Sequence, residues 1–417
     1  MKIQRCKGMR DLSTEEMKVF RLVEGVFRDC CSKWGYQEVR TPTIEYLHLF
    51  TSAGTLTPGM LGKVYSFLDW DGWSGERVVL RPDGTIPVAR LYTESLEDKG
   101  LARFFYATNI FIFEETGEKT RERWQCGAEL IGAGSSLADA ELVSLSLEVL
   151  KKLGIKGVEL RLSHAGLLKA LLVKLGLSSE EQDRMFDQIM DGDAEALARF
   201  SREHPELDSA LLPLLSLKGQ SPGILMNLKA LVAQNMPEIT PHLDELQRTV
   251  ACLDALGCSY KIDVASGAGF EYYTGMIFQL YVAGDKVGGG GRYDDLVPTM
   301  GGGDVPASGF ALYLDRLMDL VKPNIIDGTA PPRIMVRTAS GNNDAMKNAF
   351  GVAEGLREAG YITEFDLDGQ ETGGLRWIID VQGKVPPYVL IDLINNKKSE
   401  ASNTDEILIM LEGNGGD

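Results

Sequence analysis

Two apolar segments, 102–113 and 124–132, flank the polar stretch "EETGEKTRER" (114–123). Their length and their aromatic and aliphatic content are typical of β-strands. Strands joined by so short a polar connection pair antiparallel, because a parallel pairing needs a longer crossover. This feature constrains the fold more than any other, since it predicts an antiparallel sheet at the centre of the chain.

Helices and further strands are predicted on both sides of this pair. Ser13 and Glu16 have the spacing of a capping box, and apolar residues at helical spacing predict a helix to about residue 33. A second amphipathic helix is predicted over 137–154. The other expectations are strands at 35–46, 260–266 and 275–284, a hairpin over 64–82, a turn at "GGGGRYDDL" (288–296) and a helix over 309–321.

The pattern also indicates how the chain is divided. Residues from about 165 to 250 read as helical and loop-rich, which indicates an inserted or appended helical subdomain. Residues 322–332 have the composition of a linker, and a strand–helix–strand pattern follows them. We therefore predict a core domain over 1–325 that contains a helical insertion, and a C-terminal α/β domain over 331–417.

Composition and charge exclude several function classes. The chain is 44% hydrophobic and 25% charged, as in ordinary globular proteins, and its formal net charge of −17 counts against nucleic acid as the main partner. Its six cysteines form no C-x-x-C pair. We find neither a signal peptide nor a long uncharged apolar run, so we expect a cytoplasmic protein that does not span a membrane.

Common cofactor and metal signatures are absent. The glycines of "GGGGRYDDL" lack the Lys-Ser/Thr of a phosphate-binding loop, and no H-E-x-x-H is present. The four histidines lie far apart in the sequence. We therefore expect no cofactor and no metal site.

Polar residues on apolar strands remain as candidates for a binding site. Gln125 and Glu129 lie on one face of their strand, while Asp83 and Thr85 follow another. If these segments converge with Tyr272 and Tyr273, they supply carboxylates, an amide and phenol hydroxyls, which suit a small zwitterion carrying a ring N–H. The alternative is that Gln125 and Glu129 form the solvated face of an antiparallel sheet, and the local pattern alone favours it.

Several motifs in register resemble the class II histidyl-tRNA synthetase family, which implies an α+β core, an antiparallel sheet flanked by helices, and a degenerate anticodon-binding-like domain at 331–417. They cover residues 7–320 and, more weakly, 333–411. The matching segments are "KGMRDL" (7–12), "GYQEVRTPTIE" (35–45), "LRPDGT" (80–85), "RERWQCGAELIG" (121–132), "GFEYYTG" (269–275), "GGGGRYDDL" (288–296) and "GFALYLDRL" (309–317).

The departures from the synthetase pattern fall on its phosphate-handling positions. The arginine of the family's R-G-L-D-Y-Y motif falls on Ala268. The arginine of motif 2 falls on Ile112, or on Phe111 with a shift of one residue. A small glycine of motif 3 appears as Tyr313, although Arg316 is kept. Neither alanine nor isoleucine can clamp a phosphate as a guanidinium does, so the resemblance does not imply an active synthetase.

The sequence keeps the residues of the amino-acid pocket but lacks the phosphate-binding arginines. In this respect it is similar to the synthetase-like regulatory subunits of ATP phosphoribosyltransferase. The "LRPD" form of the third motif also matches that family, and the region 333–417 holds eight basic against fourteen acidic residues, the wrong sign for gripping tRNA. The resemblance implies that this chain has no catalytic residue. It also implies a hetero-octamer, which is built on dimers of this chain and includes the short catalytic subunit. Histidine would be the feedback inhibitor, held by Asp83, Thr85, Gln125, Glu129, Tyr272, Tyr273 and Tyr293.

Two alternatives stay open on the sequence. An active histidine–tRNA ligase would need other cations, for which Lys119 and Arg121 are the nearby candidates. A stand-alone histidine sensor would need no transferase partner.

Overall fold

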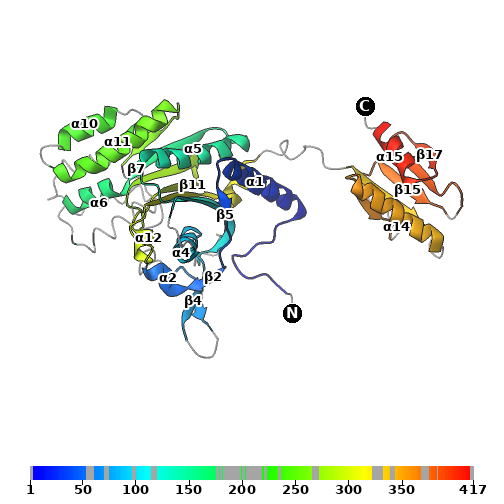
Figure 1. Cartoon of the computed structure of the whole chain (residues 1–417), viewed down its shortest axis with the longest axis horizontal. Coiled ribbons are helices and arrows are strands. Elements are labelled where there is room, and N and C mark those ends of the chain that lie inside the picture. The colour runs from blue at the N-terminus through cyan, green and yellow to red at the C-terminus, as the bar shows by residue number, and fades with distance from the viewer. Residues whose placement is uncertain are drawn as a thin grey trace. The chain divides into compact units, whose positions relative to one another are not determined.

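The computed structural model describes most of the chain, and Figure 1 shows its two compact units, residues 1–326 and 327–417. The described residues are 3–52, 61–69, 75–95, 100–113, 120–174, 178, 181, 199, 202, 218–219, 223–232, 236–264, 272–321, 332–338, 343–367, 375–382 and 384–413.

A nine-stranded sheet forms the centre of the first unit. Its strand order is β1-β5-β6-β12-β11-β10-β7-β9-β8, and its pairs are antiparallel except β1 with β5 and β7 with β9. The strands are β1 (Gln37–Glu38), β5 (Ala102–Phe111), β6 (Glu122–Ile131), β7 (Val158–His164), β8 (Lys218–Gly219), β9 (Lys261–Asp263), β10 (Met276–Val282), β11 (Asp285–Arg292) and β12 (Ala307–Tyr313). The predicted pairing of 102–113 with 124–132 is confirmed by β5 and β6.

The long helices cover one face of this sheet, and the shorter helix α4 (Thr85–Ser95) lies on the other (Figure 1). The capping box is confirmed, since the Ser13 hydroxyl accepts from the Glu16 N–H at 3.3 Å and Glu16 accepts from the Ser13 N–H at 2.7 Å. Phe27 then meets Phe105 and Phe310 edge to face, with ring centroids 6.0 and 6.4 Å apart. On the first face lie α1 (Thr14–Lys33) and α5 (Ser136–Lys152), and α11 (Thr240–Ala255) packs against α5.

Shorter elements complete the first unit. The predicted hairpin over 64–82 is confirmed by β3 (Ser66–Leu68) and β4 (Arg77–Leu80), which pair antiparallel and form a small sheet with β2 (Ile44–Tyr46). The other helices are α2 (Leu47–Ser52), α4 (Thr85–Ser95), α6 (Ala165–Lys174), α10 (Gly223–Val232), the 3₁₀ helix η1 (Pro237–Ile239), α12 (Leu296–Thr299) and α13 (Leu314–Leu320).

Two sequence-based expectations are wrong in this unit. The glycine run is not a turn: Gly288–Gly291 lie inside β11, and the turn falls at Ala283 and Gly284, both with positive φ. A Cβ on Gly290 would lie 2.1 Å from the carbonyl oxygen of Gly309, so the strands pack too closely for a side chain there. The expected helix over 309–321 begins only at Leu314, because the residues before it form the buried strand β12.

The second unit is a five-stranded mixed sheet of order β14-β13-β15-β16-β17 with its own apolar core. It consists of β13 (Arg333–Thr338), α14 (Asn343–Glu358), β14 (Ile362–Phe365), β15 (Trp377–Val381), β16 (Tyr388–Asp392), β17 (Lys397–Ala401) and α15 (Thr404–Gly413). Among the helices within the described ranges, none has both the length and the apolar composition of a membrane span.

Candidate functional site

A cavity lies on the sheet face opposite α1 and α5, and it gathers most of the candidate residues. Its walls include Asp83 and Thr85 from the start of α4, Gln125 from β6, and three tyrosines. The full lining among described residues is Asp83, Thr85, Gln125, Tyr272, Tyr273, Ile277, Phe278, Gln279, Lys286, Gly289, Gly290, Tyr293, Gly309, Phe310, Ala311 and Tyr313.

The floor of the cavity is nearly bare of side chains, because small residues face it from neighbouring strands. Gly127 of β6 pairs with Ala311 of β12, and Ala311 pairs with Gly289 of β11. A Cβ on Gly127 would lie 2.3 Å from the ring of Tyr106, so that ring occupies the space above the glycine. Tyr106 was missed by the sequence analysis, and the only available signal was a glycine within an otherwise regular strand.

Asp83 holds its carboxylate at the N-terminal end of α4. It is 3% exposed, and its Oδ1 accepts from the Ile86 N–H at 2.9 Å. Burial raises the pKa of Asp83 to about 6, although the backbone N–H groups of Ile86, Thr85 and Gly84 oppose that rise. A cationic amine in the cavity would find here a buried carboxylate already fixed in place.

Glu129 is fully buried and lies behind the cavity lining rather than in it. The Thr85 hydroxyl donates to Glu129 at 2.7 Å, and the Tyr293 hydroxyl donates to the other carboxylate oxygen. A Cβ on Gly309 would lie 1.8 Å from that second oxygen, so glycine is required where β12 passes Glu129. Burial raises the pKa of Glu129 to about 8, against the two hydroxyl hydrogen bonds.

The solvated-face alternative for β6 is therefore wrong. Gln125 is 4% exposed and Glu129 is 0% exposed. The Gln125 amide donates to the Tyr106 hydroxyl at 3.3 Å, which links the strand to its neighbour β5.

The raised pKa of Glu129 predicts that stability falls as pH rises. In the unfolded chain this carboxyl ionises near 4.5, and in the folded protein near 8, so between these values only the folded state keeps the proton. The free energy of unfolding should then decrease by about 1.4 kcal/mol per pH unit from this group, the effect being complete above the folded pKa. Urea unfolding from pH 5 to 8 should show a flatter dependence in Glu129→Gln than in the wild type, and parallel curves would contradict the assignment.

Aromatic rings form another part of the cavity wall. The ring of Tyr272 lies 5.0 Å from Tyr273 and meets Tyr293 edge to face at 5.4 Å between centroids. Burial is the main reason why the pKa of each of these phenols lies above its ordinary value. The hydroxyls therefore stay protonated; that of Tyr293 donates to Glu129, and that of Tyr273 can donate to a ligand.

Cations are scarce around the cavity. Lys286 is the sole cationic residue among the described residues that line it. Arg121, a candidate replacement for the lost arginines, stacks on Phe113 at 4.4 Å and donates to the Tyr65 hydroxyl at 3.3 Å, and it is absent from the lining. Ala268, Glu271 and Lys119 lie outside the described residues.

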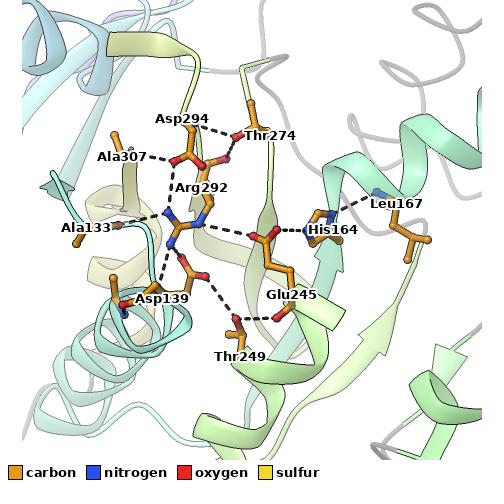
Figure 2. A network of polar contacts seen from close by, with 12 residues as sticks. Ala133, Asp139, His164, Leu167, Glu245, Thr249, Thr274, Arg292, Asp294 and Ala307 are labelled. Carbon is orange, nitrogen blue, oxygen red and sulfur yellow. Dashed lines mark hydrogen bonds and ion pairs between the residues drawn. The ribbon is translucent and has the colours of Figure 1, made fainter. Parts of the chain in front are cut away.

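Arg292, the residue before Tyr293, ties this wall to α5 and α11 (Figure 2). Its guanidinium lies 2.6 Å from Asp139 of α5, 3.3 Å from Asp294 and 3.7 Å from Glu245 of α11. Glu245 also lies 3.3 Å from His164. In the described part of the chain no group of three or more His, Cys, Asp or Glu side chains is arranged to hold a metal ion.

Known proteins match this chain over nearly its whole length. The sequence profile described as "Histidyl-tRNA synthetase" matches residues 8–317. An ATP phosphoribosyltransferase regulatory subunit of Dehalococcoides mccartyi is 49% identical over 411 residues, which are 99% of this chain and 99% of the relative. A histidine–tRNA ligase of Methanosarcina acetivorans is 37% identical over 77% of this chain and 76% of the ligase.

Solved structures show the same fold. A Bacillus halodurans protein described as an ATP phosphoribosyltransferase regulatory subunit/histidyl-tRNA synthetase superposes with a TM-score of 0.77 at 25% identity, covering 92% of this chain and 100% of that one. Histidyl-tRNA synthetase from Nostoc superposes with a TM-score of 0.74 at 19% identity, over 99% and 100% of the two chains. These neighbours confirm the expected class II synthetase-like fold.

Proposed function

We propose that this chain binds L-histidine in the cavity described above and thereby regulates a separate catalytic subunit. The chain belongs to the histidyl-tRNA synthetase family and, within it, to the ATP phosphoribosyltransferase regulatory subunits. The regulatory assignment follows from relatives that match nearly the whole chain. The observation that supports L-histidine as the ligand is a buried cavity that brings Asp83, Gln125 and several tyrosines together above a floor with few side chains.

Each candidate residue has a role that its chemistry allows. Asp83 and Thr85 bind the α-amino group of histidine, because a buried carboxylate and a hydroxyl suit an ammonium ion. Gln125 binds the backbone end of the ligand. Tyr273 reads the imidazole nitrogens, and Tyr272 and Tyr293 complete the wall. The expected contact of Glu129 with the imidazole is indirect, because Glu129 lies behind the lining and acts through the Thr85 and Tyr293 hydroxyls that it holds.

We also propose that this chain supplies no catalytic residue. Phe111 and Ile112 stand at the motif 2 arginine position, and neither side chain can neutralise a phosphate. Tyr313 lines the cavity where the synthetase motif has a small glycine. Positioned charge dominates phosphoryl and adenylyl chemistry, so a site without these cations should be inactive in histidine adenylation.

The proposed partners are the short catalytic subunit of ATP phosphoribosyltransferase and a second copy of this chain, assembled as a hetero-octamer. An apolar row on the small sheet supports the self-association. Tyr46, Val78 and Phe67 lie side by side across β2, β4 and β3, and Tyr46 and Phe67 are each 43% exposed. Large exposed apolar residues gathered on one face indicate a protein contact. We do not expect tRNA as a partner.

Reconstitution tests this function. Mixing the chain with a cognate short catalytic subunit should produce a complex that elutes together and forms phosphoribosyl-ATP from ATP and phosphoribosyl pyrophosphate. Neither protein alone should do so, and L-histidine should suppress the activity of the mixture. Light scattering during elution gives the mass of the assembly and hence its stoichiometry.

Other outcomes would favour the alternatives. Histidine-dependent exchange of pyrophosphate into ATP by the chain alone would indicate a ligase. Histidine binding by a chain that neither co-elutes with nor activates the cognate subunit would indicate a stand-alone sensor.

A further inference from the structure

The carboxylate of an amino acid in this cavity has no arginine to receive it among the described lining residues. Asp83 and the tyrosine hydroxyls account for an ammonium group and a ring. A buried carboxylate without a cationic or multiple hydrogen-bonding partner is strongly unfavourable. Gln125, assigned above to the backbone end of the ligand, is neutral, and Lys286 is the single cation in the described lining.

A β-bulge directs Lys286 towards the cavity. In β11 the pairing with β10 shifts between Leu280 and Tyr281, so that Gly288 opposes Leu280 while Lys286 opposes Tyr281. Val287 is the extra residue, and it is fully buried. In a regular strand, residues three apart face opposite sides of the sheet, and one inserted residue brings them to the same side. Lys286 thereby shares the cavity face with Gly289.

The contacts of Lys286 agree with this direction. A Cβ built on Gly289 would lie 3.6 Å from the Cε atom of Lys286, so the lysine stem extends over the bare floor. Its Nζ lies 5.9 Å from the ring centroid of Tyr313, another lining residue. Within the part of the chain that the structure describes, no carboxylate lies in ion-pair distance of this ammonium group.

The arrangement places opposite charges on two sides of one cavity. Asp83 belongs to the side formed by α4, which packs against β6, whereas Lys286 belongs to β11. The sheet order places β12 between β6 and β11, so the two strands lie roughly 10 Å apart. A zwitterion held by its ammonium group at Asp83 can extend its carboxylate in the direction of the flexible lysine side chain.

We propose that Lys286 binds the carboxylate of the amino acid in this cavity and so takes the place of the arginine absent from the family motif. The inference rests on the proposed histidine-binding function and adds the residue that distinguishes an amino acid from its decarboxylated amine.

A comparison of L-histidine with histamine tests the inference, because the two differ only in the carboxylate. In the full-length wild type, isothermal titration should show tighter binding of L-histidine. In Lys286→Met the dissociation constant for L-histidine should rise about 10- to 100-fold, the range expected for one charge-assisted hydrogen bond, while that for histamine should stay within about twofold. Lys286→Arg should retain most of the preference for L-histidine.

Lys151→Met is the matched control, since it removes one positive charge from an exposed position on α5. It should leave both dissociation constants unchanged. The inference is overturned if Lys286→Met leaves L-histidine binding unchanged, or weakens both ligands equally. If the wild type itself binds no L-histidine, the proposed histidine-binding function is wrong. The inference about Lys286 is then refuted as well, before any variant is made.

Discussion

Replacing Glu129 with alanine is expected to weaken the binding of L-histidine by about 100-fold or more. The carboxylate accepts from the hydroxyls of Thr85 and Tyr293, and all three groups are buried. Alanine would leave both hydroxyls without their acceptor, so the side chains of Thr85 and Tyr293 would no longer be held in place in the cavity wall; each buried unsatisfied group would also lower the stability of the folded protein by about 1–3 kcal/mol. The substitution would further remove the carboxyl group through which this wall is positioned against the imidazole. Both losses fall on the same wall of the cavity.

Titration of L-histidine into the purified variants measures this effect, and feedback inhibition of the reconstituted complex should be lost in parallel. Glu129→Gln keeps an acceptor for the hydroxyls and should lie between alanine and the wild type. Glu76→Ala, an exposed carboxylate just before β4, is the matched control. Unchanged affinity and inhibition in a folded Glu129→Ala variant would exclude this pocket as the histidine site.

Replacing Arg292 with methionine is expected to lower the free energy of unfolding by about 3–5 kcal/mol, the usual cost of removing one partner from a buried ion pair. The side chains of Arg292 and Asp139 are only 4% and 1% exposed and lie 2.6 Å apart. The guanidinium also donates to the backbone carbonyls of Ala133 and Ser135, at 3.3 and 3.1 Å. Methionine would leave the Asp139 carboxylate buried beside Glu245 without a cation (Figure 2).

Urea unfolding of the two single variants and of the double variant separates the pair from its surroundings. Arg292→Met combined with Asp139→Leu removes both charges and should recover much of the loss, because an apolar pair can replace a buried ion pair at little cost. Additive losses in the double variant would contradict this account and would assign the stability to the carbonyl contacts instead.

The sequence predicts the central antiparallel strands well, because β5 and β6 carry long patterns that few other structures could bury. The prediction fails where the same residues fit both a helical and a strand pattern. Residues 309–321 contain apolar residues at helical spacing, yet β12 is buried on both faces and therefore reads as a continuous apolar run. The glycine run fails for another reason: glycine is disfavoured in strands, and only the close approach of β12 explains it there.

The candidate site likewise contains residues that the sequence predicts and residues that it does not. Residues beside recognisable motifs, such as Asp83 and Gln125, line the cavity as expected. Tyr106 belongs to the site because its ring fills the space above two glycines of other segments, Gly84 and Gly127, which no local pattern reveals. Lys286 belongs to it because a bulge reverses the side on which it lies. Tyr106 depends on contacts between segments that lie apart in the sequence, whereas the bulge belongs to a hairpin of consecutive strands and leaves no mark in the residue pattern.

The glycines near the cavity limit where this protein can be mutated to bind a new ligand. A mutant library that randomises Gly127, Gly290 or Gly309 should yield mostly misfolded chains, since a first carbon at any of them meets an occupied position within 2.3 Å. Diversity is better placed in the walls, at Tyr272 and Tyr313, which line the cavity. The shape of the pocket is thus adjustable from the sides while its base stays fixed.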